Sequence, residues 1–199
     1  MGPIILDGKG IDSCDKFTAL ISYFRKNTPN MKDPYLNLFI SEIHRRLIGE
    51  GQERILKCLD LLSEEEVWFR PNPQSNSVGN LVLHLCGNVT QWLFSTMAEE
   101  ADRRHRQAEF AEQGPIAKEI LKDKVVALMN KADILLKTLR EDQLSQTYSV
   151  QGYRENGIAI LIHITEHFSY HVGQITYFVK AHKNIDTGYY AGQDLNKTS

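Results

Sequence analysis

The chain has 199 residues, of which 42% are hydrophobic and 24% charged, a composition typical of folded globular proteins and not of disordered or collagen-like ones. Lys and Arg number 23 against 25 Asp and Glu, so the net charge is −2 and no overall positive field favours nucleic acid or an anionic membrane. We therefore expect neither as a partner. A chain of this length can fold without a stabilising metal, so any metal site in it is expected to serve chemistry.

The three cysteines, Cys14, Cys58 and Cys86, form no Cys-x-x-Cys pair, which disfavours both a disulfide framework and a thiolate zinc cluster. No apolar run approaches the roughly 18 residues of a membrane-spanning helix. The apolar residues near the N-terminus are too few for a signal peptide. We expect a cytoplasmic protein that is neither exported nor inserted in a membrane.

A short helix over residues 11–26 is the first expected element, within an N-terminal extension that covers residues 1–33. Four longer helices follow, because apolar residues recur at helical spacing and Pro34 and Pro115 suit a first helical turn. Their expected ranges are 34–62, 78–97, 115–139 and 158–181. These four helices predict a single all-α domain, a four-helix bundle over residues 34–182, followed by a polar C-terminal tail over 183–199.

Each long helix has an apolar face that we expect to be buried. In the first helix, Gly49 and Gly51 weaken the middle. In the second helix the expected stripe is Val78, Leu81, Val82, Leu85, Val89, Trp92 and Leu93. In the third helix it is Ile116, Ile120, Val125, Leu128, Leu135 and Leu139. In the fourth helix it is Leu161, Ile164, Phe168, Val172, Ile175 and Val179.

Two connections between the helices have distinct compositions. Residues 99–114 are charge-dense and nearly free of large apolar residues, so an exposed connection is expected. The basic residues within it are interpreted as part of a solvated loop because acidic residues surround them. These basic residues are Arg103, Arg104, His105 and Arg106. Residues 143–157 contain Thr, Tyr, Val and two Gly, and predict a short hairpin or an irregular crossover.

Three histidines, His163, His167 and His171, lie at i, i+4 and i+8 in the fourth helix. Neighbouring members of such a series are about 5 to 6 Å apart and can share a metal ion, whereas the outer two are about 12 Å apart along the axis. His167 and His171 lie closer to the apolar stripe than His163, which falls on the polar side. We predict that His167 and His171 form the pair directed at the bundle interior.

The second helix places His84 beside its buried stripe, with Asn88 one turn further on. His84 can therefore offer a third imidazole to the facing pair. Cys86 points about 200° away from His84 and is interpreted as a small core residue. The isolated histidines are interpreted as ordinary residues at the edge of the core. These are His44, His105 and His182.

Three neutral imidazoles that leave one coordination position open are typical of a catalytic zinc-type site. In such a site the ion acts as a Lewis acid and lowers the pKa of a bound water or thiol. Asn88, Gln174 and His163 are candidates for contacts behind the ligands or with substrate. The alternative is a group of core histidines without a metal, because His-x-x-x-His is only moderately specific.

The same residues resemble a known family. Residues 76–88 (NSVGNLVLHLCGN) and 163–175 (HITEHFSYHVGQI) are similar to the two signatures of the DinB-like superfamily, and residues 68–71 (WFRP) to the segment that precedes the first. The resemblance covers residues 35–182. It implies a four-helix bundle of unusual connection order, commonly a homodimer, in which a divalent ion is bound by three histidines. Carried over by position, these are His84, His167 and His171.

Characterised members of this superfamily include transferases and isomerases that use a low-molecular-weight thiol such as bacillithiol, mycothiol or glutathione. The leading hypothesis is therefore a metal-dependent thiol S-transferase, in which Zn²⁺ or Ni²⁺ activates a small thiol for attack on an electrophile. One alternative is a non-catalytic dimeric module that binds a metal or another ligand. A second alternative is a metal-dependent hydrolase that uses metal-bound water as nucleophile.

Overall fold

The computed structural model describes residues 34–198, and the helix expected at 11–26 lies outside them. Its first helical stretch comprises α2 (Pro34–His44), the π-helical segment η1 (Arg45–Gln52) and α3 (Glu53–Leu61). The wider π turns coincide with the two glycines that weaken this helix. At Gly51, a Cβ atom would lie 2.7 Å from Cε1 of Phe168, so the absence of a side chain lets the two helices approach closely.

The second stretch comprises α5 (Val78–Val89), the π-helical segment η2 (Thr90–Phe94) and α6 (Ser95–Met97). It begins as predicted, because Oγ of Ser77 accepts a hydrogen bond of 3.1 Å from the backbone N–H of Asn80. All seven residues of its expected stripe are buried. The short helix α4 (Glu64–Trp68), which was not predicted, precedes α5. It begins with a capping box formed by Ser63 and Glu66.

The third long helix, α8 (Lys118–Thr138), begins three residues later than expected and buries a different face. Its buried residues are Leu121, Val125, Met129, Ala132 and Leu136. Ile120, which we expected to be buried, is 50% exposed, and Ile134 is 66% exposed. Of the expected stripe only Val125 is buried, because apolar residues occupy both this face and the adjacent one. Helical spacing alone therefore does not select the buried face.

The segment before the fourth helix contains α9 (Glu141–Ser145) and a hairpin of β1 (Thr147–Val150) and β2 (Tyr153–Asn156). The antiparallel register pairs Val150 with Tyr153. The two residues between them both have positive φ, 50° at Gln151 and 84° at Gly152, as a tight two-residue hairpin turn requires. The hairpin alternative predicted for residues 143–157 is therefore confirmed.

The fourth long helix, α10 (Gly157–Lys183), is capped by Asn156, whose Oδ1 accepts from the backbone N–H of Ala159. It ends at Asn184, which has a left-handed conformation with φ of 54°. All six residues of its expected stripe are buried. Beyond this helix, the hydroxyl of Tyr189 lies 3.0 Å from Sγ of Cys58, so the start of the tail packs against α3.

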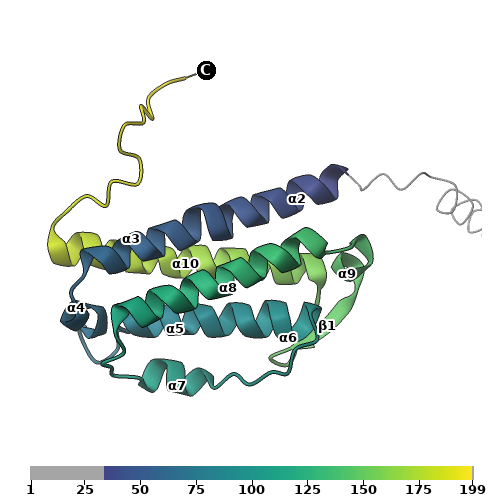
Figure 1. The fold of residues 1–199 in the computed structure, drawn as a ribbon, viewed down its shortest axis with the longest axis horizontal. Coiled ribbons are helices and arrows are strands. Elements are labelled where there is room, and N and C mark those ends of the chain that lie inside the picture. The colour runs from purple at the N-terminus through teal and green to yellow at the C-terminus, as the bar shows by residue number, and fades with distance from the viewer. Residues whose placement is uncertain (1–33, 199) are drawn as a thin grey trace, which may run out of the picture. The chain divides into compact units, whose positions relative to one another are not determined.

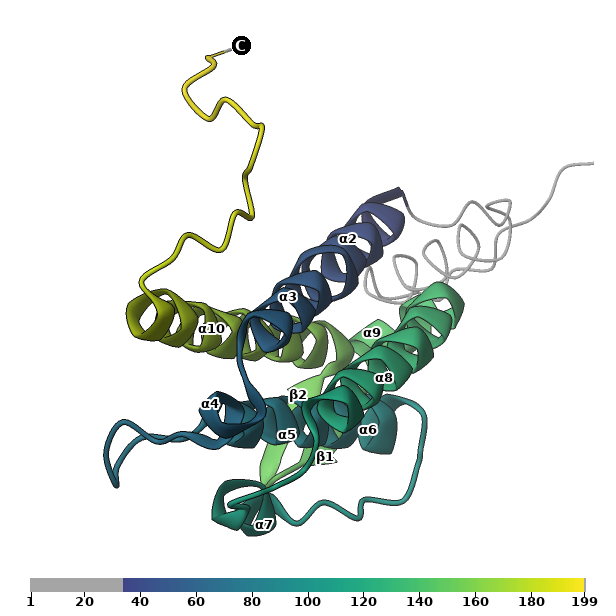
Figure 2. The same cartoon turned by 60° about the vertical axis from the view of Figure 1, so that its left-hand side comes forward.

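The four helical stretches form a four-member bundle with an unusual order (Figures 1 and 2). α10 packs between α3 and α5, and α8 packs between α5 and η1, so the first stretch lies diagonally opposite α5. In Figure 1, α5 and α8 run in the same direction. The connection between them must therefore return along the roughly 30 Å length of the second stretch. It does so through α7 (Arg106–Ala111), which packs against α5.

Among residues 34–198, we find no helix that combines the length and apolar character needed to cross a bilayer.

Candidate metal centre

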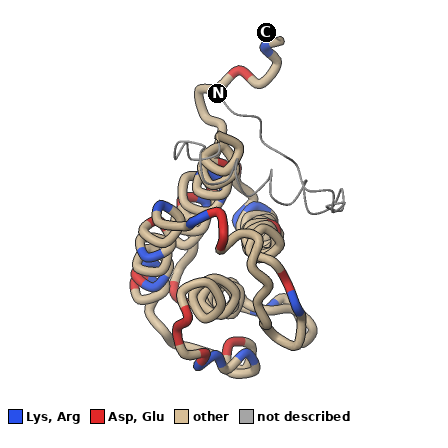
Figure 3. Tube along the Cα trace, turned by 90° about the vertical axis from the view of Figure 1, so that its right-hand side faces the viewer, with Lys and Arg blue, Asp and Glu red and all other residues tan. Residues whose placement is uncertain are grey.

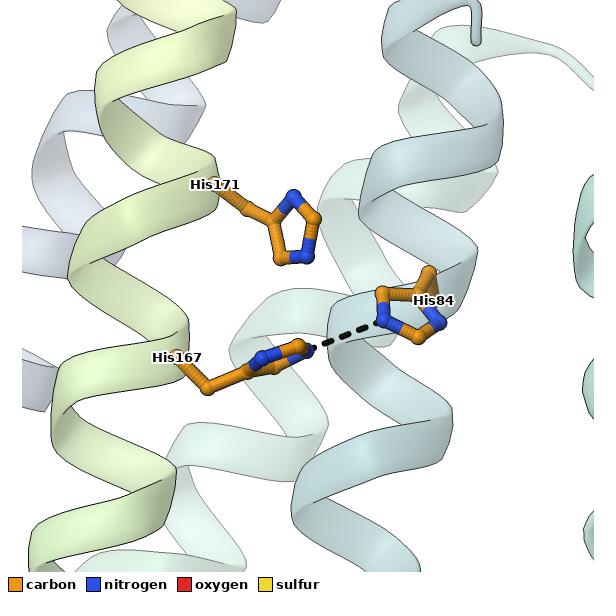
Figure 4. Close-up of side chains that lie close together, drawn as sticks. All are labelled: His84, His167 and His171. Atoms are coloured by element: carbon orange, nitrogen blue, oxygen red, sulfur yellow. Dashed lines mark hydrogen bonds between the residues drawn. The ribbon is translucent and has the colours of Figure 1, made fainter.

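Three histidines from two facing helices meet inside the bundle (Figure 4). His84 comes from α5, and His167 and His171 come from α10. Each offers one ring nitrogen, and the three nitrogens lie within 4.8 Å of one another. Nε2 of His84 lies 2.9 Å from Nε2 of His167. The structure thus brings together the three residues that the sequence selected, in a group that could hold a metal ion.

The electrostatics of this cluster favour neutral imidazoles at His167 and His171. His84 and His171 are buried, and His167 is half-buried. Burial, followed by the proximity of His171 and His84, lowers the pKa of His167 from 6.5 to about 3. Burial also lowers the pKa of His171. At neutral pH these two rings therefore carry free lone pairs, which is the form that binds a divalent cation.

The second nitrogens of two of these rings are held by other side chains. Oε2 of Glu109 lies 2.9 Å from Nδ1 of His84, and because a carboxylate only accepts, His84 donates its Nδ1 hydrogen to it. Oε1 of Gln174 accepts a hydrogen bond of 2.7 Å from Nδ1 of His171. In both rings Nδ1 is therefore the donor to these side chains, which leaves Nε2 as the nitrogen available to the cluster. Partners of this kind fix the tautomer and orientation of metal-binding histidines.

Arg104 in turn holds Glu109. Its Nε donates to Oε1 of Glu109 at 2.7 Å and its Nη2 donates to Oε2 at 2.9 Å, while Nη1 donates to Gln91. Nη2 also lies 3.1 Å from Nδ1 of His84, and the carboxylate between these two donors accepts from both. Burial acts to raise the pKa of Glu109, but hydrogen bonds from His84 and Arg104 outweigh it and keep this pKa below its usual value.

The interpretation of residues 103–106 as part of a solvated loop was wrong for Arg104, whose side chain is only 3% exposed. Around α7, basic and acidic residues lie side by side (Figure 3), and the pair formed by Arg104 and Glu109 is directed inward onto His84. The physical reason is the crossover between two parallel helices, which brings this connection back along α5. Composition alone did not identify Glu109 as a contact of the cluster.

Gly87 makes room for this arrangement. It lies on α5, and a Cβ atom there would collide with Oε1 of Glu109. A glycine costs about 1 kcal/mol relative to alanine inside a helix, so this position is better explained by the approach of the carboxylate than by helix stability. The ring of Phe110 also packs against the ring of His84, with the ring centroids 4.6 Å apart.

His163 and Asn88, two of the candidates for supporting contacts, lie next to the cluster. His163 is half-buried because its ring stacks on that of Trp92, at a centroid distance of 3.7 Å. Nδ2 of Asn88 lies 3.4 Å from Nε2 of His163. Neither residue contributes to the three-nitrogen group, whereas the third candidate, Gln174, contacts His171 directly.

Cys86 takes no part in the cluster, as expected from its direction on α5. Its side chain is partly exposed, so its interpretation as a core residue was only partly right. Burial nevertheless raises the pKa of its thiol to about 12. The thiolate form, which binds metals and reacts with electrophiles, is therefore strongly disfavoured at neutral pH.

Comparison with known proteins agrees with this fold. A conserved protein from Enterococcus faecalis has 20% identity and a TM-score of 0.58, and the match covers 73% of this chain and 97% of that one. A DinB-like protein from Bacillus subtilis has 18% identity and a TM-score of 0.57, over 73% and 94% of the two chains. A DinB-like protein from Bacillus cereus has 16% identity and a TM-score of 0.55, over 70% and 89%.

The fold is thus that of the DinB-like proteins, as the two sequence signatures predicted. Residues 30–189 match the family described as "Protein of unknown function (DUF1572)", and the chain belongs to this family. A search among curated proteins gave no match.

Proposed function

We propose that the protein is a metal-dependent transferase that activates a low-molecular-weight thiol for attack on an electrophile. The observation that carries the proposal is the three-nitrogen group of His84, His167 and His171, together with the side chains that orient it. Among residues 34–198 this group consists of three histidines, the donor set of catalytic rather than structural zinc-type sites. Cys86 does not belong to this group, because its position on α5 directs it away from His84.

The residues present fit a divalent cation such as Zn²⁺ or Ni²⁺. Nε2 of His84 and Nε2 of His167 are 2.9 Å apart, and two lone pairs this close repel unless they share a hydrogen or a cation. The lowered pKa of His167 disfavours the additional protons that would compete with the cation. When bound, the cation would supply Lewis acidity, which lowers the pKa of a thiol or a water molecule that it coordinates.

The remaining steps depend on the chain's own side chains. Glu109 fixes the tautomer of His84, and Gln174 fixes that of His171. Arg104 holds the Glu109 carboxylate ionised and in place. In the overall reaction a sulfur–carbon bond forms, the leaving group of the electrophile departs with its bonding electrons, and the thiol proton passes to solvent.

Three untested expectations accompany this proposal, two from composition and helical pattern and the homodimer from the resemblance. They are a cytoplasmic location, a homodimer, and a bundle domain over residues 34–182. Light scattering at several protein concentrations tests the homodimer, and a mass equal to one chain at all of them would exclude it.

Turnover with a model electrophile tests the function. Metal-loaded protein is expected to conjugate chlorodinitrobenzene to glutathione or bacillithiol, with release of chloride. The variant His84→Ala should lose this activity while circular dichroism shows an intact fold. The matched control is His44→Ala, which removes a histidine paired with Asp133 outside the cluster. Equal activity of wild type and His84→Ala would refute the proposal, and metal-dependent ester hydrolysis without thiol transfer would favour the hydrolase instead.

A further inference from the structure

A pocket of about 650 Å³ has among its lining residues Leu81 and Gln174, each one helical turn along the chain from a histidine of the cluster. Its walls are the beginning of α5, the end of α10 and the loop between α4 and α5. Figure 2 shows this loop extending past the ends of α5 and α10. The volume falls within the roughly 300 to 1,000 Å³ range of small-molecule sites.

Two residues connect the pocket with the cluster. Gln174 lines the pocket, and its Oε1 is also the acceptor for Nδ1 of His171. Leu81 lines the pocket from α5, one turn before His84. A molecule in the pocket would therefore contact Gln174, the residue that accepts a hydrogen bond from His171.

The lining of the pocket is aromatic and carries no permanent charge. Phe178 and His182 stack with their ring centroids 5.1 Å apart and an angle of 11° between the rings, and Phe69 lies 5.3 Å from His182. The polar lining residues are three amides, two hydroxyls and the imidazole of His182, and none of the residues found to line the pocket is Lys, Arg, Asp or Glu. Flat apolar surfaces with a few hydrogen-bonding groups favour a planar, uncharged ligand.

The walls are held in place by their own hydrogen bonds. Oδ1 of Asn72 accepts from the backbone N–H of Gln74 at 3.0 Å and from the hydroxyl of Ser75 at 3.1 Å. At the start of this loop, Arg70 donates to Oδ1 of Asn80 at 2.8 Å and to the backbone carbonyl of Phe110 at 2.6 Å. A loop fixed at both points needs little ordering on binding, which favours affinity for a small ligand.

We propose that this pocket binds the electrophilic substrate, an uncharged planar molecule with an aromatic or conjugated group. The inference rests on the proposed function, because it assigns one of the two substrates of that reaction. Low-molecular-weight thiols such as glutathione carry carboxylates, which require a cationic partner when they are desolvated. The pocket offers no Lys or Arg among its described lining residues, so it suits the electrophile and not the thiol.

Binding of two dyes of similar shape tests the chemistry of the pocket without any turnover. N-phenylnaphthylamine is uncharged, and anilinonaphthalene sulfonate carries one negative charge. The uncharged dye is expected to bind wild-type protein at least about tenfold more tightly than the sulfonate. Ala181, on the exposed end of α10, lines the pocket, and Ala181→Trp should weaken binding of the uncharged dye by about tenfold or more because it fills the space.

The matched control is Ala127→Trp, which adds the same side chain at an exposed position on α8 outside the pocket lining. It should leave dye binding unchanged. Equal affinity for the two dyes, or unchanged binding in Ala181→Trp, would overturn the assignment.

In active protein, Ala181→Trp should raise KM for chlorodinitrobenzene and leave both KM for the thiol and the metal content unchanged. An increase in KM for the thiol instead would also overturn it. Failure of the proposed function remains distinguishable, because it would appear as absent metal or absent turnover in wild-type protein while the dye experiment still reports on the pocket.

Discussion

Glu109→Gln tests whether the side chains behind the histidines contribute to metal binding. The carboxylate accepts from His84 at 2.9 Å and receives two hydrogen bonds from Arg104 at 2.7 and 2.9 Å. A glutamine has one acceptor oxygen and no charge, so it cannot accept from both residues equally or increase the basicity of the imidazole. Loss of such a partner typically lowers metal affinity by about 10- to 100-fold, equivalent to about 1.4 to 2.8 kcal/mol.

The assay is competition for Zn²⁺ between metal-free protein and a chromophoric chelator of known affinity. Glu100→Gln is the matched control, because Glu100 lies in the same connection but is exposed and paired with Lys131. It removes the same charge and should leave the affinity within about twofold of wild type. If Glu109→Gln bound Zn²⁺ as tightly as Glu100→Gln, the role assigned to Glu109 would be refuted.

A second variant disturbs the contact between Glu109 and His84 without a change of charge. Gly87→Ala places a methyl group where the Glu109 carboxylate lies, and is expected to lower Zn²⁺ affinity in the same direction. Its control is Gly49→Ala, because nothing lies within 4 Å of a Cβ atom at Gly49. An effect of Gly49→Ala equal to that of Gly87→Ala would point to a general effect of glycine replacement instead.

Three further predictions concern pH, thiol reactivity and packing. In metal-free protein the pKa of His167 is about 3 in the folded state against 6.5 in the unfolded chain, so the unfolded chain binds the extra proton between these values. The free energy of unfolding in urea should therefore fall as pH is lowered from 6.5, and less steeply in His167→Gln; equal slopes would contradict this. Cys86, with a pKa of about 12, should be alkylated much more slowly at pH 8 in native than in urea-unfolded protein, as measured by peptide mass spectrometry. Fast labelling of the native protein would refute the raised pKa of this thiol. Leu136→Ala should destabilise the fold by about 2 to 5 kcal/mol, and Ile134→Ala, at a position 66% exposed, by no more than about 0.5 kcal/mol. Similar losses of stability in both variants would contradict the buried face assigned to α8.

The sequence predicted the helices that carry the histidines because each has a continuous apolar stripe at helical spacing. Every residue of both expected stripes is buried, although Ile158 and Ile162 of α10 lie outside its stripe and are 45% and 49% exposed. The rotation of these two helices therefore follows from the stripes, and with it the side on which His84, His167 and His171 lie. The stripe expected for α8 was right only at Val125, because that helix has apolar residues on two adjacent faces.

The contacts of Arg104 and Glu109 with His84 could not be predicted from local composition or from helical periodicity. Charge-dense composition predicts exposure for an average loop, but this connection joins two parallel helices and must pass along α5. That requirement depends on the order in which the helices pack, which periodicity does not determine. Gly87, in the middle of a predicted helix, was the local signal that another group approaches there closely.

Metal content tests the central claim most directly. Elemental mass spectrometry on tag-free protein, after reconstitution and desalting, is expected to give about one divalent ion per chain for wild type. His167→Ala should lose the ion, whereas His44→Ala, which alters a histidine outside the cluster, should retain it. Absence of metal from reconstituted wild type, or full retention in His167→Ala, would contradict the assignment of this histidine cluster as the metal site.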